Sequence, residues 1–553
     1  MTTAAEPHAP PRVEIFREIA LWPVQLMPRH EGAQIQRHWE CLEAASAESV
    51  WQEVADEFTL DPADFSERHY KEFVTFLPFV QRFLYGEGSV GGRQGYGGSP
   101  IRVFRRHDVA RVRIAFPDDA APISFDVAHV DLYFFYDIDI AILAVEIKGE
   151  RLALSQALET LYRFGRTYPT YWKPDKRGGH CADRVEWLSH NGEALAVSDY
   201  ENRERYLRFV CEHRAPCVAS HWEYLIQPLV LDHTLREGPV RYRQLEYQRM
   251  PLMSFFALDD KTRLTRGDLM RIGLAARPGD AQTLPYSERF LEDFERRYCY
   301  DRYWEEARPH DFSDTRFIAN GHDFSVIGEA GDAFFTDAEG GMLGQFRHQY
   351  FLFFLISHFH KAALLMLANR LVIALSRLDI RRPESVRVFR REVRHITEIF
   401  LRFTHRYWFH EVSDEAQARD LFRMMRTHLD TDGQYERTRL RILDMNDYLE
   451  RDQLRRQADT VVRLTVVTTF GLIGTISTGF LGMNLIAAAD NPFGTKFLYF
   501  MLVFVPTLAL TVYTVVKSKR LADFLEALAD ERLTRRDKLN ILMSVWKKAR
   551  RLS

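Results

Sequence analysis

Several familiar signatures are missing from this 553-residue chain. Its five cysteines are scattered and include no Cys-x-x-Cys pair, which suits a reducing compartment and predicts no disulfide framework. The 74 Lys and Arg nearly balance the 77 Asp and Glu, and the net charge of −3 argues against general nucleic-acid binding. No nucleophile elbow or P-loop occurs, and residues 1–12 lack the basic and apolar regions of a secretory signal. We therefore expect a cytosolic bulk without enzymatic activity.

Two long uncharged stretches near the C-terminus stand out instead. They cover residues 464–489 and 497–516, and a short loop separates them. A bilayer core of ~30 Å needs about 20 apolar residues of helix, so both stretches are long enough to cross it. The sequence predicts two transmembrane helices.

The basic residues around these stretches predict their orientation. Four arginines lie in 451–463 and three Lys or Arg in 517–520, whereas the intervening loop offers only Asp490 and Lys496 as charged residues. Because positive charge favours the cytoplasmic side, both termini are expected in the cytoplasm. We predict a multi-pass protein of the plasma membrane, which for a bacterium is the inner membrane.

Gly482-Met483-Asn484 lies at the far end of the first predicted span. A large N-terminal domain followed by two spans, with this motif at the outer end of the first, resembles the CorA family of divalent-cation transport proteins. The family usually carries Tyr just before the motif, where this chain has Leu481. The resemblance covers about the last hundred residues, and it implies a homopentamer in the lipid bilayer that transports Mg²⁺.

A seven-residue repeat precedes the motif. Positions spaced alternately by three and four share one helix face. One row contains Asp447, Leu454, Val461, Thr468 and Thr475, and its companion row contains Asp444, Arg451, Ala458, Thr465 and Leu472. This face is the seam of a coiled coil or, if the resemblance holds, the lining of a pentameric pore.

The resemblance also implies roles for individual residues. Asn484 would form a selectivity ring that recognises the hydrated ion through its waters, with Gly482 and Met483 completing the filter. Thr475 would continue the polar lining, and Asp447 would form an acidic ring that attracts cations. Intracellular Mg²⁺ would also be regulatory. Co²⁺, Ni²⁺ and Zn²⁺ remain alternative cargoes, and the direction of transport stays open.

The chain upstream predicts an α/β cytosolic domain, a helical stalk and the two spans. Residues 132–147 read as a hairpin, 152–164 as a helix and 253–257 as a strand, while Thr265 and Asp268 form a helix cap. The apolar run 350–356 reads as a buried helix because charged residues soon interrupt it. The predicted regions are a tail (1–30), the α/β domain (31–300), a helical region (301–433), stalk and first span (434–485), loop (486–496), second span (497–516) and a basic, headgroup-binding or solvated tail (517–553).

Three short motifs suggest other chemistry. Asp131 with Glu146 and Lys148 resembles the metal-binding carboxylates of some nucleases, although a surface hairpin is the simpler interpretation. Gly86-x-Gly88-x-x-Gly91 matches a dinucleotide fingerprint in letters alone and reads as a loop. Four possible zinc donors lie within eleven residues: Cys211, His213, Cys217 and His221. Their number suits a tetrahedral zinc site, but their spacing matches no known zinc finger, and the alternative is that they are ordinary core residues.

Two further function classes therefore accompany the channel hypothesis. The cytosolic part of about 440 residues is long enough to bind a signal, so the chain is alternatively a sensor that uses its spans as an anchor or a triggered leak. The other class is a membrane-anchored nuclease built on Glu146 and Lys148.

Overall fold

The computed structural model describes most of the chain in two compact units, Met1–Ile442 and Leu443–Ser553. The described residues are 10–29, 36–43, 49–54, 67–86, 99–117, 121–234, 237–246, 248–280, 282–305, 313–379, 382–482 and 492–529.

A large mixed sheet forms the centre of the first unit. Its described strands are β1 (Arg12–Leu26), β2 (Trp51–Glu53), β3 (Ile101–Arg106), β4 (Arg111–Ala115), β5 (Ile123–Phe135), β6 (Ile138–Ala153), β7 (Arg184–Leu188), β8 (Ala194–Val197), β9 (Leu229–Leu231), β10 (Val240–Gln244), β11 (Leu252–Leu258), β12 (Cys299–Tyr303), β13 (Thr315–Ala319) and β14 (Asp323–Glu329). The main path runs β12-β13-β14-β11-β1-β6-β5-β4-β7-β8. Within the described residues, pairing is antiparallel except for β11 with β14 and β9 with β10.

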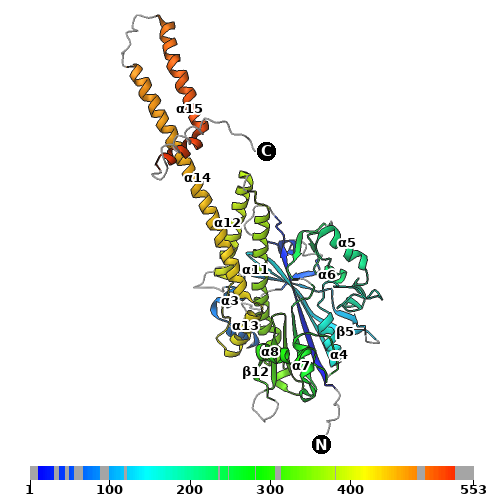
Figure 1. The fold of residues 1–553 in the computed structure, drawn as a ribbon. Helices are drawn as coiled ribbons and strands as arrows, with labels where there is room; N and C mark the ends of the chain where they lie inside the picture. Colours follow the sequence, from blue (N-terminus) through cyan, green and yellow to red (C-terminus); the bar gives the residue numbers. More distant parts are fainter. Residues whose placement is uncertain are drawn as a thin grey trace. The chain divides into compact units, whose positions relative to one another are not determined.

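The longest described helices lie in the C-terminal part of the chain (Figure 1). The described helices are α1 (Glu40–Glu43), α2 (Glu67–Thr75), α3 (Pro78–Tyr85), α4 (Leu154–Arg163), α5 (Arg203–His213), α6 (Ser220–Leu225), α7 (Arg266–Gly273), α8 (Glu288–Tyr298), α9 (Ala333–Thr336), α10 (Met342–Gln345), α11 (Phe351–Ser376), α12 (Pro383–Arg406), α13 (Ala416–His428), α14 (Thr431–Gly482) and α15 (Phe493–Ala529), with short turns η1 (Lys261–Arg263) and η2 (Phe346–Tyr350). The predominance of helix after residue 345 was predicted and is confirmed.

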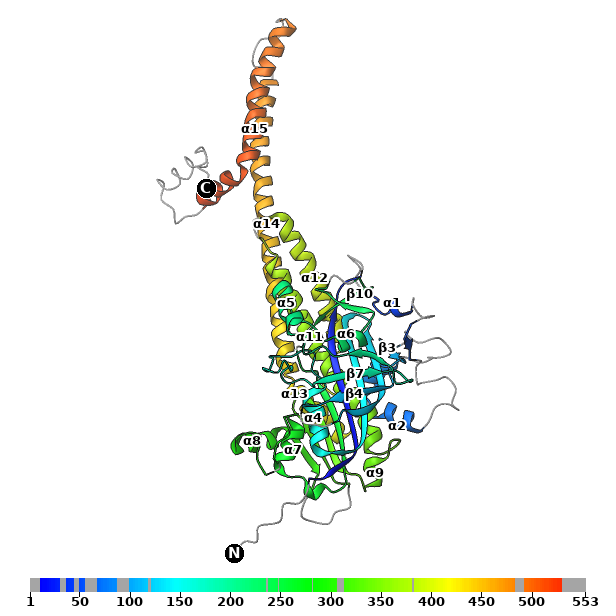
Figure 2. The ribbon, with the colours of Figure 1, turned by 90° about the vertical axis from the view of Figure 1, so that its right-hand side faces the viewer.

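Helices cover both faces of the sheet because successive side chains of a strand point to opposite faces. On one face Phe134 belongs to the core that contains Leu158 of α4 and Met270 of α7. On the other face Phe135 stacks on Phe359 of α11, with ring centres 3.8 Å apart. Figure 2 shows β1, in dark blue, running the length of the sheet between these layers.

Several local predictions are confirmed. β5 and β6 form the expected hairpin, although it is longer than 132–147 and lies inside the sheet rather than on the surface. α4 and β11 correspond to the predicted helix 152–164 and strand 253–257, and their ends differ from the predicted ones by one or two residues. Thr265 caps α7, and its side chain accepts a hydrogen bond from the Asp268 amide.

The predicted borders of the cytosolic region differ from the structure at both ends. β1 lies within the segment 1–30 that was read as a tail, and β12 to β14 extend the sheet past residue 300 to Glu329. β1 is buried on both faces over most of its length, so it lacks the alternation that marks a half-buried strand. A run without alternation gives no periodic signal, which explains the missed strand.

Two described helices are long and apolar enough to cross a membrane. One is the segment Met342–Ser376, whose most apolar 18-residue window is 72% buried within the first unit, and the other is Phe493–Leu510 at the start of α15, with 0% buried. The prediction that 350–356 belongs to a buried helix is therefore confirmed. The first predicted span, 464–489, begins in α14 but continues beyond the described residues after Gly482.

Candidate functional site

The predicted lining row is exposed on α14 in the second unit. Val461 is 63% exposed and Leu472 is 61% exposed. The other predicted members that are exposed in the single chain are Asp447, Ala458, Thr465, Thr468 and Thr475. A face of this kind is available to other copies of the chain or to lipid.

The opposite side of α14 packs within the unit. Val466 is fully buried, and a Cβ added to Gly474 would lie 2.8 Å from Cγ2 of Thr507 on α15. With roughly 100° of rotation per residue, Thr468 and Leu472 lie on the other side of the helix from Val466 and Gly474. The predicted row therefore faces away from the contact with α15.

The threonines of the row bond to their own helix. The Thr475 hydroxyl donates to the Gly471 carbonyl at 2.9 Å, and the Thr468 hydroxyl donates to the Leu464 carbonyl at 2.8 Å. The Thr465 hydroxyl does the same with Val461. Because each hydroxyl hydrogen is committed to the backbone, the oxygen lone pairs remain as acceptors. Such oxygens suit ligands that donate hydrogen bonds, as the waters around a cation do.

The signature motif lies almost entirely outside the described residues. Gly482 is the last residue of α14, and Met483 and Asn484 fall in the stretch that the structure leaves undescribed. The roles predicted for these two residues therefore stay predictions. The same holds for the loop 486–491 and for the chain after Ala529.

Asp447 and Asp444 occupy the lower part of the row. Both carboxylates are exposed, and neither makes an ion pair with any residue that the structure describes. By contrast, Asp452, which lies off the row, pairs with Arg456 across one helical turn at 2.8 Å. The acidic residues of the row are thus left to solvent in the single chain.

The nuclease-like residues lie in a charged cluster on the sheet. Asp131 accepts two hydrogen bonds of 2.8 Å from Arg105. Glu146 pairs with Arg17 at 2.5 Å and with Arg347 of η2 at 3.2 Å. Lys148 points to Asp126 at 3.7 Å. Because arginine side chains already hold both carboxylates, the arrangement favours a structural network over a metal site.

The four candidate zinc donors are not brought together among the described residues. Cys217 and His221 are buried in the core, whereas Cys211 is exposed on α5. The His213 ring instead lies 6.4 Å from the ring of His233. Throughout the described residues, no group of three or more His, Cys, Asp or Glu side chains could hold a metal ion. Of the Gly-rich fingerprint, only Gly86 is described.

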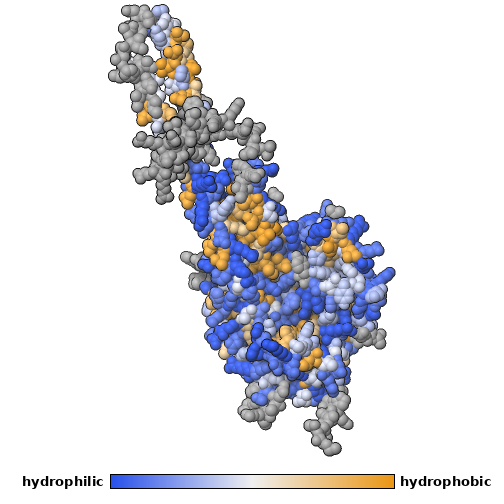
Figure 3. Space-filling view, viewed as in Figure 1, coloured by the Kyte–Doolittle hydropathy of each residue, from blue (hydrophilic) through white to orange (hydrophobic). Residues whose placement is uncertain are grey.

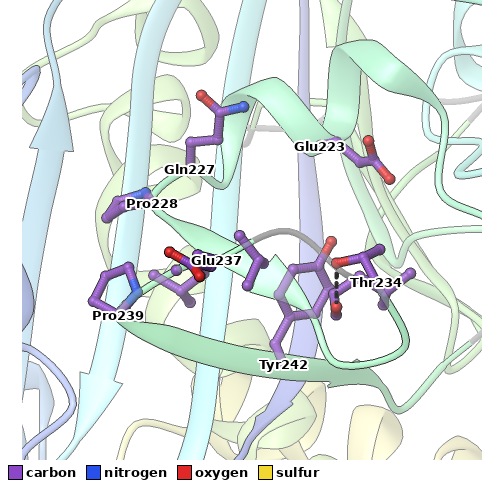
Figure 4. A pocket seen from close by; sticks show the side chains of 11 residues that line it. Glu223, Gln227, Pro228, Thr234, Glu237, Pro239 and Tyr242 are labelled. Atoms are coloured by element: carbon purple, nitrogen blue, oxygen red, sulfur yellow. Dashed lines mark hydrogen bonds between the residues drawn. The ribbon is translucent and has the colours of Figure 1, made fainter.

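A pocket of about 390 Å³ lies beside β9 and β10 in the first unit. Glu223, Gln227 and Glu237 come to it from three different segments, and Tyr242 lies beneath them (Figure 4). Thr234 at its edge donates its hydroxyl hydrogen to the Leu231 carbonyl at 2.8 Å. None of the residues that the sequence predicted to be functional lines this pocket.

Sequence reasoning missed two buried charged groups in the first unit. Glu18 on β1 is fully buried, and both of its carboxylate oxygens lack a hydrogen-bond partner. Arg166 after α4 is 7% exposed. The sequence did carry a signal for Glu18. Residues 15–22 are apolar apart from Arg17 and Glu18, so Glu18 is the one acidic residue in this run. Arg166 gave no such signal, because arginine is common after a helix.

Comparison with protein-family models, with curated proteins and with solved structures found no match to this chain. Figure 3 shows the relevant contrast: the surface of the first unit is largely hydrophilic, whereas hydrophobic side chains face outward along α15.

Proposed function

We propose that this chain is a membrane channel or transporter for hydrated divalent cations, with Mg²⁺ as its cargo, and that five copies assemble around one pore. The proposal combines the family resemblance of the Gly-Met-Asn motif with the placement of the lining row on α14. The row is exposed and lies opposite the side that packs on α15, which is where a lining face must lie in a ring with α14 inside and α15 outside. This observation carries the proposal.

The chemistry of the row favours a cation that keeps its waters. Mg²⁺ gives up its hydration shell reluctantly, so a fast pathway should contact the waters and not the bare ion. Hydroxyls such as that of Thr475, whose hydrogen is held by the Gly471 carbonyl, present acceptor oxygens to such waters. The Asn484 amide oxygen has the same acceptor character without a fixed charge that would hold the ion. Leu472, 61% exposed, supplies an apolar constriction that can exclude water when closed.

Acidic residues at the lower end of the row would raise the local concentration of cations. Asp447 and Asp444 are exposed and make no ion pair with the described residues, so their charge is available to a passing ion. Five copies would place ten carboxylates around one axis. Focused negative charge of this kind accelerates the entry of cations.

The decisive experiment measures ion flux in vesicles that contain the purified full-length chain, across Mg²⁺, Co²⁺, Ni²⁺ and Zn²⁺. Wild type should pass Mg²⁺, and cobalt(III) hexaammine should block it because this inert complex matches a hydrated ion in form. Asn484→Ala should abolish uptake and lose the block while the assembly, measured by mass in detergent, remains pentameric. Preferential Zn²⁺ flux would change the cargo, and retained Mg²⁺ selectivity in Asn484→Ala would contradict the role of the ring.

A matched pair of threonine variants tests the lining row itself. Thr475→Ala removes an acceptor oxygen from the row and should reduce Mg²⁺ flux. Thr507→Ala removes the same group from α15, where the side chain packs against Gly474, and should leave flux near the wild-type level. Equal effects of the two changes would mean that the row does not line the pathway.

A signal-gated form of the same membrane unit is the second candidate function. The first unit devotes 442 residues and a 14-stranded sheet, counted over the described residues, to something other than the pathway. Ion flux that appears only in the presence of another ligand would favour this class over constitutive transport.

A further inference from the structure

Arg166 is a buried cation without a matching anion. It follows α4 and is 7% exposed, and its Nε donates to the Tyr162 carbonyl at 3.1 Å. No carboxylate among the described residues lies within ion-pair distance of its guanidinium. Arginine is rarely buried to this extent unless it is paired. Arg166 therefore lacks the carboxylate partner that a buried arginine usually has.

Two acidic groups of this region, Glu159 and Asp323, already pair with other arginines. Glu159 pairs with Arg163, which also donates to the Cys181 carbonyl at 2.9 Å. Asp323 accepts two bonds, of 2.8 and 2.9 Å, from Arg249. Burial and the nearby Arg249 guanidinium lower the pKa of Arg166 to about 10. The surroundings of Arg166 thus carry excess positive charge.

An aromatic group completes these surroundings and reaches the surface. The guanidinium carbons of Arg163 and Arg166 each lie 5.3 Å from the centre of the Tyr162 ring. The Tyr162 hydroxyl hydrogen-bonds to Nδ1 of His180. Burial, then Arg166 and Arg163, lower the pKa of His180, so its ring is neutral at pH 7. A neutral imidazole bonded at Nδ1 can still offer its other nitrogen to a ligand.

The loop that carries His180 is shaped to present Tyr171. The Gly179 amide donates to the Tyr171 carbonyl at 2.7 Å, and a Cβ at Gly179 would overlap the Tyr171 ring. The Tyr171 ring lies edge-on to His180, with centres 5.2 Å apart, and remains 47% exposed. His180 itself has a left-handed φ of 65°, which is uncommon for a residue other than glycine. Loops keep such backbone conformations where they position a functional group.

We propose that Arg166, Arg163, Tyr162 and His180 bind the phosphoryl group of a small phosphorylated metabolite, and that Tyr171 contacts the body of that metabolite. The Arg166 guanidinium, the N–H groups of Arg163 that Glu159 and the Cys181 carbonyl leave over, and the one donor that the Tyr162–His180 pair keeps can bind a phosphate dianion, which has three oxygens to accept them. Tyr171 supplies an exposed aromatic surface next to them. The inference rests on the first unit alone and does not depend on the channel.

Titration calorimetry on the full-length chain in detergent tests the site with three probes: inorganic phosphate, phenyl phosphate and benzoate. Both phosphates should bind saturably, with phenyl phosphate tighter because of Tyr171, and benzoate should bind at least about tenfold more weakly. Equal binding of benzoate would overturn the phosphoryl assignment. No saturable heat from either phosphate would overturn the site.

Arg166→Met is the key variant, and Arg208→Met on the exposed face of α5 is its control. Arg166→Met should weaken phenyl phosphate at least about tenfold, since a hydrogen-bonded charge is removed, and the control should change nothing. Without ligand, Arg166→Met should unfold at the same or a higher temperature than wild type, because an unpaired buried charge is lost. Clear destabilisation together with unchanged phosphate binding would show a structural role and overturn the proposal.

Gly179→Ala and the His180 resonance provide independent readouts. A methyl group at Gly179 must displace Tyr171, so the variant should lose the preference for phenyl phosphate over phosphate and keep phosphate binding. Bound phosphate should raise the pKa of His180, measured by NMR, because an adjacent dianion favours the imidazolium. An unchanged pKa of His180 at saturating phosphate would contradict the site.

Discussion

Two helical segments of this chain have the same mean hydropathy, 1.7, and meet opposite surroundings. The window in Met342–Ser376 is 72% buried within the first unit, whereas the window in Phe493–Leu510 is 0% buried. α11 lies against the sheet, with Phe359 stacked on Phe135. Among the described residues, no comparable protein surface covers Phe493–Leu510, so the apolar side chains of this segment need lipid or other chains. Hydropathy alone does not distinguish a core helix from a span.

The polar residues of the two helices distinguish the core helix from the candidate span better than hydropathy does. α11 includes His358 and His360, both buried, and His360 bonds to the Tyr407 carbonyl at 2.5 Å. Burial lowers the pKa of His360 to about 3, so the ring is neutral in the folded protein. The fold thus holds both imidazoles away from water, and the Tyr407 carbonyl gives His360 a hydrogen-bond partner. In Phe493–Leu510 the only ionisable side chains are Lys496 and Tyr499, near its N-terminal end.

The largest expected effect comes from the packing of α11. Phe359→Ala should lower the free energy of unfolding by about 3–5 kcal/mol, because a fully buried aromatic ring is removed from the face of the sheet. Val372→Ala, on a side chain that is 60% exposed, should cost less than about 0.5 kcal/mol. Denaturant unfolding in detergent, followed by a spectroscopic signal of the first unit, measures the free energy of unfolding of both variants. A small loss for Phe359→Ala would mean that α11 is not a core helix.

A charge placed on α15 tests the other half of the comparison. Leu502 is 70% exposed, and Leu502→Arg should make the free energy of membrane insertion less favourable by about 2.5–3.5 kcal/mol. The protein should then be released from membranes by alkaline carbonate. Leu375→Arg, in the last turn of α11 and 52% exposed, should leave the membrane fraction unchanged. Release by both variants, or by neither, would break the distinction drawn between the helices.

Much of the local structure could be predicted because its signals are local. The β5–β6 hairpin, α4, β11 and the Thr265 cap follow from alternation, helical spacing and cap chemistry within a few residues. β1 was missed because a strand buried on both faces has no alternation, and its partners β6 and β11 lie more than a hundred residues away. Long-range pairing leaves no mark in a short stretch of sequence.

The dependence on long-range contacts also limits how much of the candidate sites could be predicted from the sequence. The heptad spacing on α14 is local, and it placed Thr468 and Leu472 on one exposed face. The environment of Arg166 depends on Glu159 and Asp323 being occupied by other arginines, and Asp323 is 157 positions away in the chain. No spacing rule reports which of many arginines in a sequence will lack a carboxylate.

Glu18 makes the pH dependence of the first unit testable. Burial raises its pKa from 4.5 to about 8, with Asp323 adding to the rise and Arg249 opposing it. The folded state therefore holds a proton that the unfolded state has released, and stability should fall as the pH rises from about 4.5 to 8. Glu18→Gln should flatten this slope, because the amide does not titrate, and the gain in stability over wild type should be largest near pH 8. An unchanged slope in thermal unfolding across pH 5–8 would contradict the burial of an unpaired acid.

Asp447 is the exposed counterpart of Glu18 and should give the smallest effect. It lies four heptads before Thr475 and makes no ion pair with the described residues, so its charge acts through solvent on arriving cations. Asp447→Asn should reduce Mg²⁺ flux a few-fold at low ionic strength. The reduction should fade near 0.15 M salt, where the Debye length is about 8 Å. Asp452→Asn, which breaks the surface pair with Arg456 off the row, is the matched control and should leave flux unchanged at any salt concentration. If both variants behave alike at low salt, the acidic row does not face the ion, and the helical phase assigned to the pore is wrong.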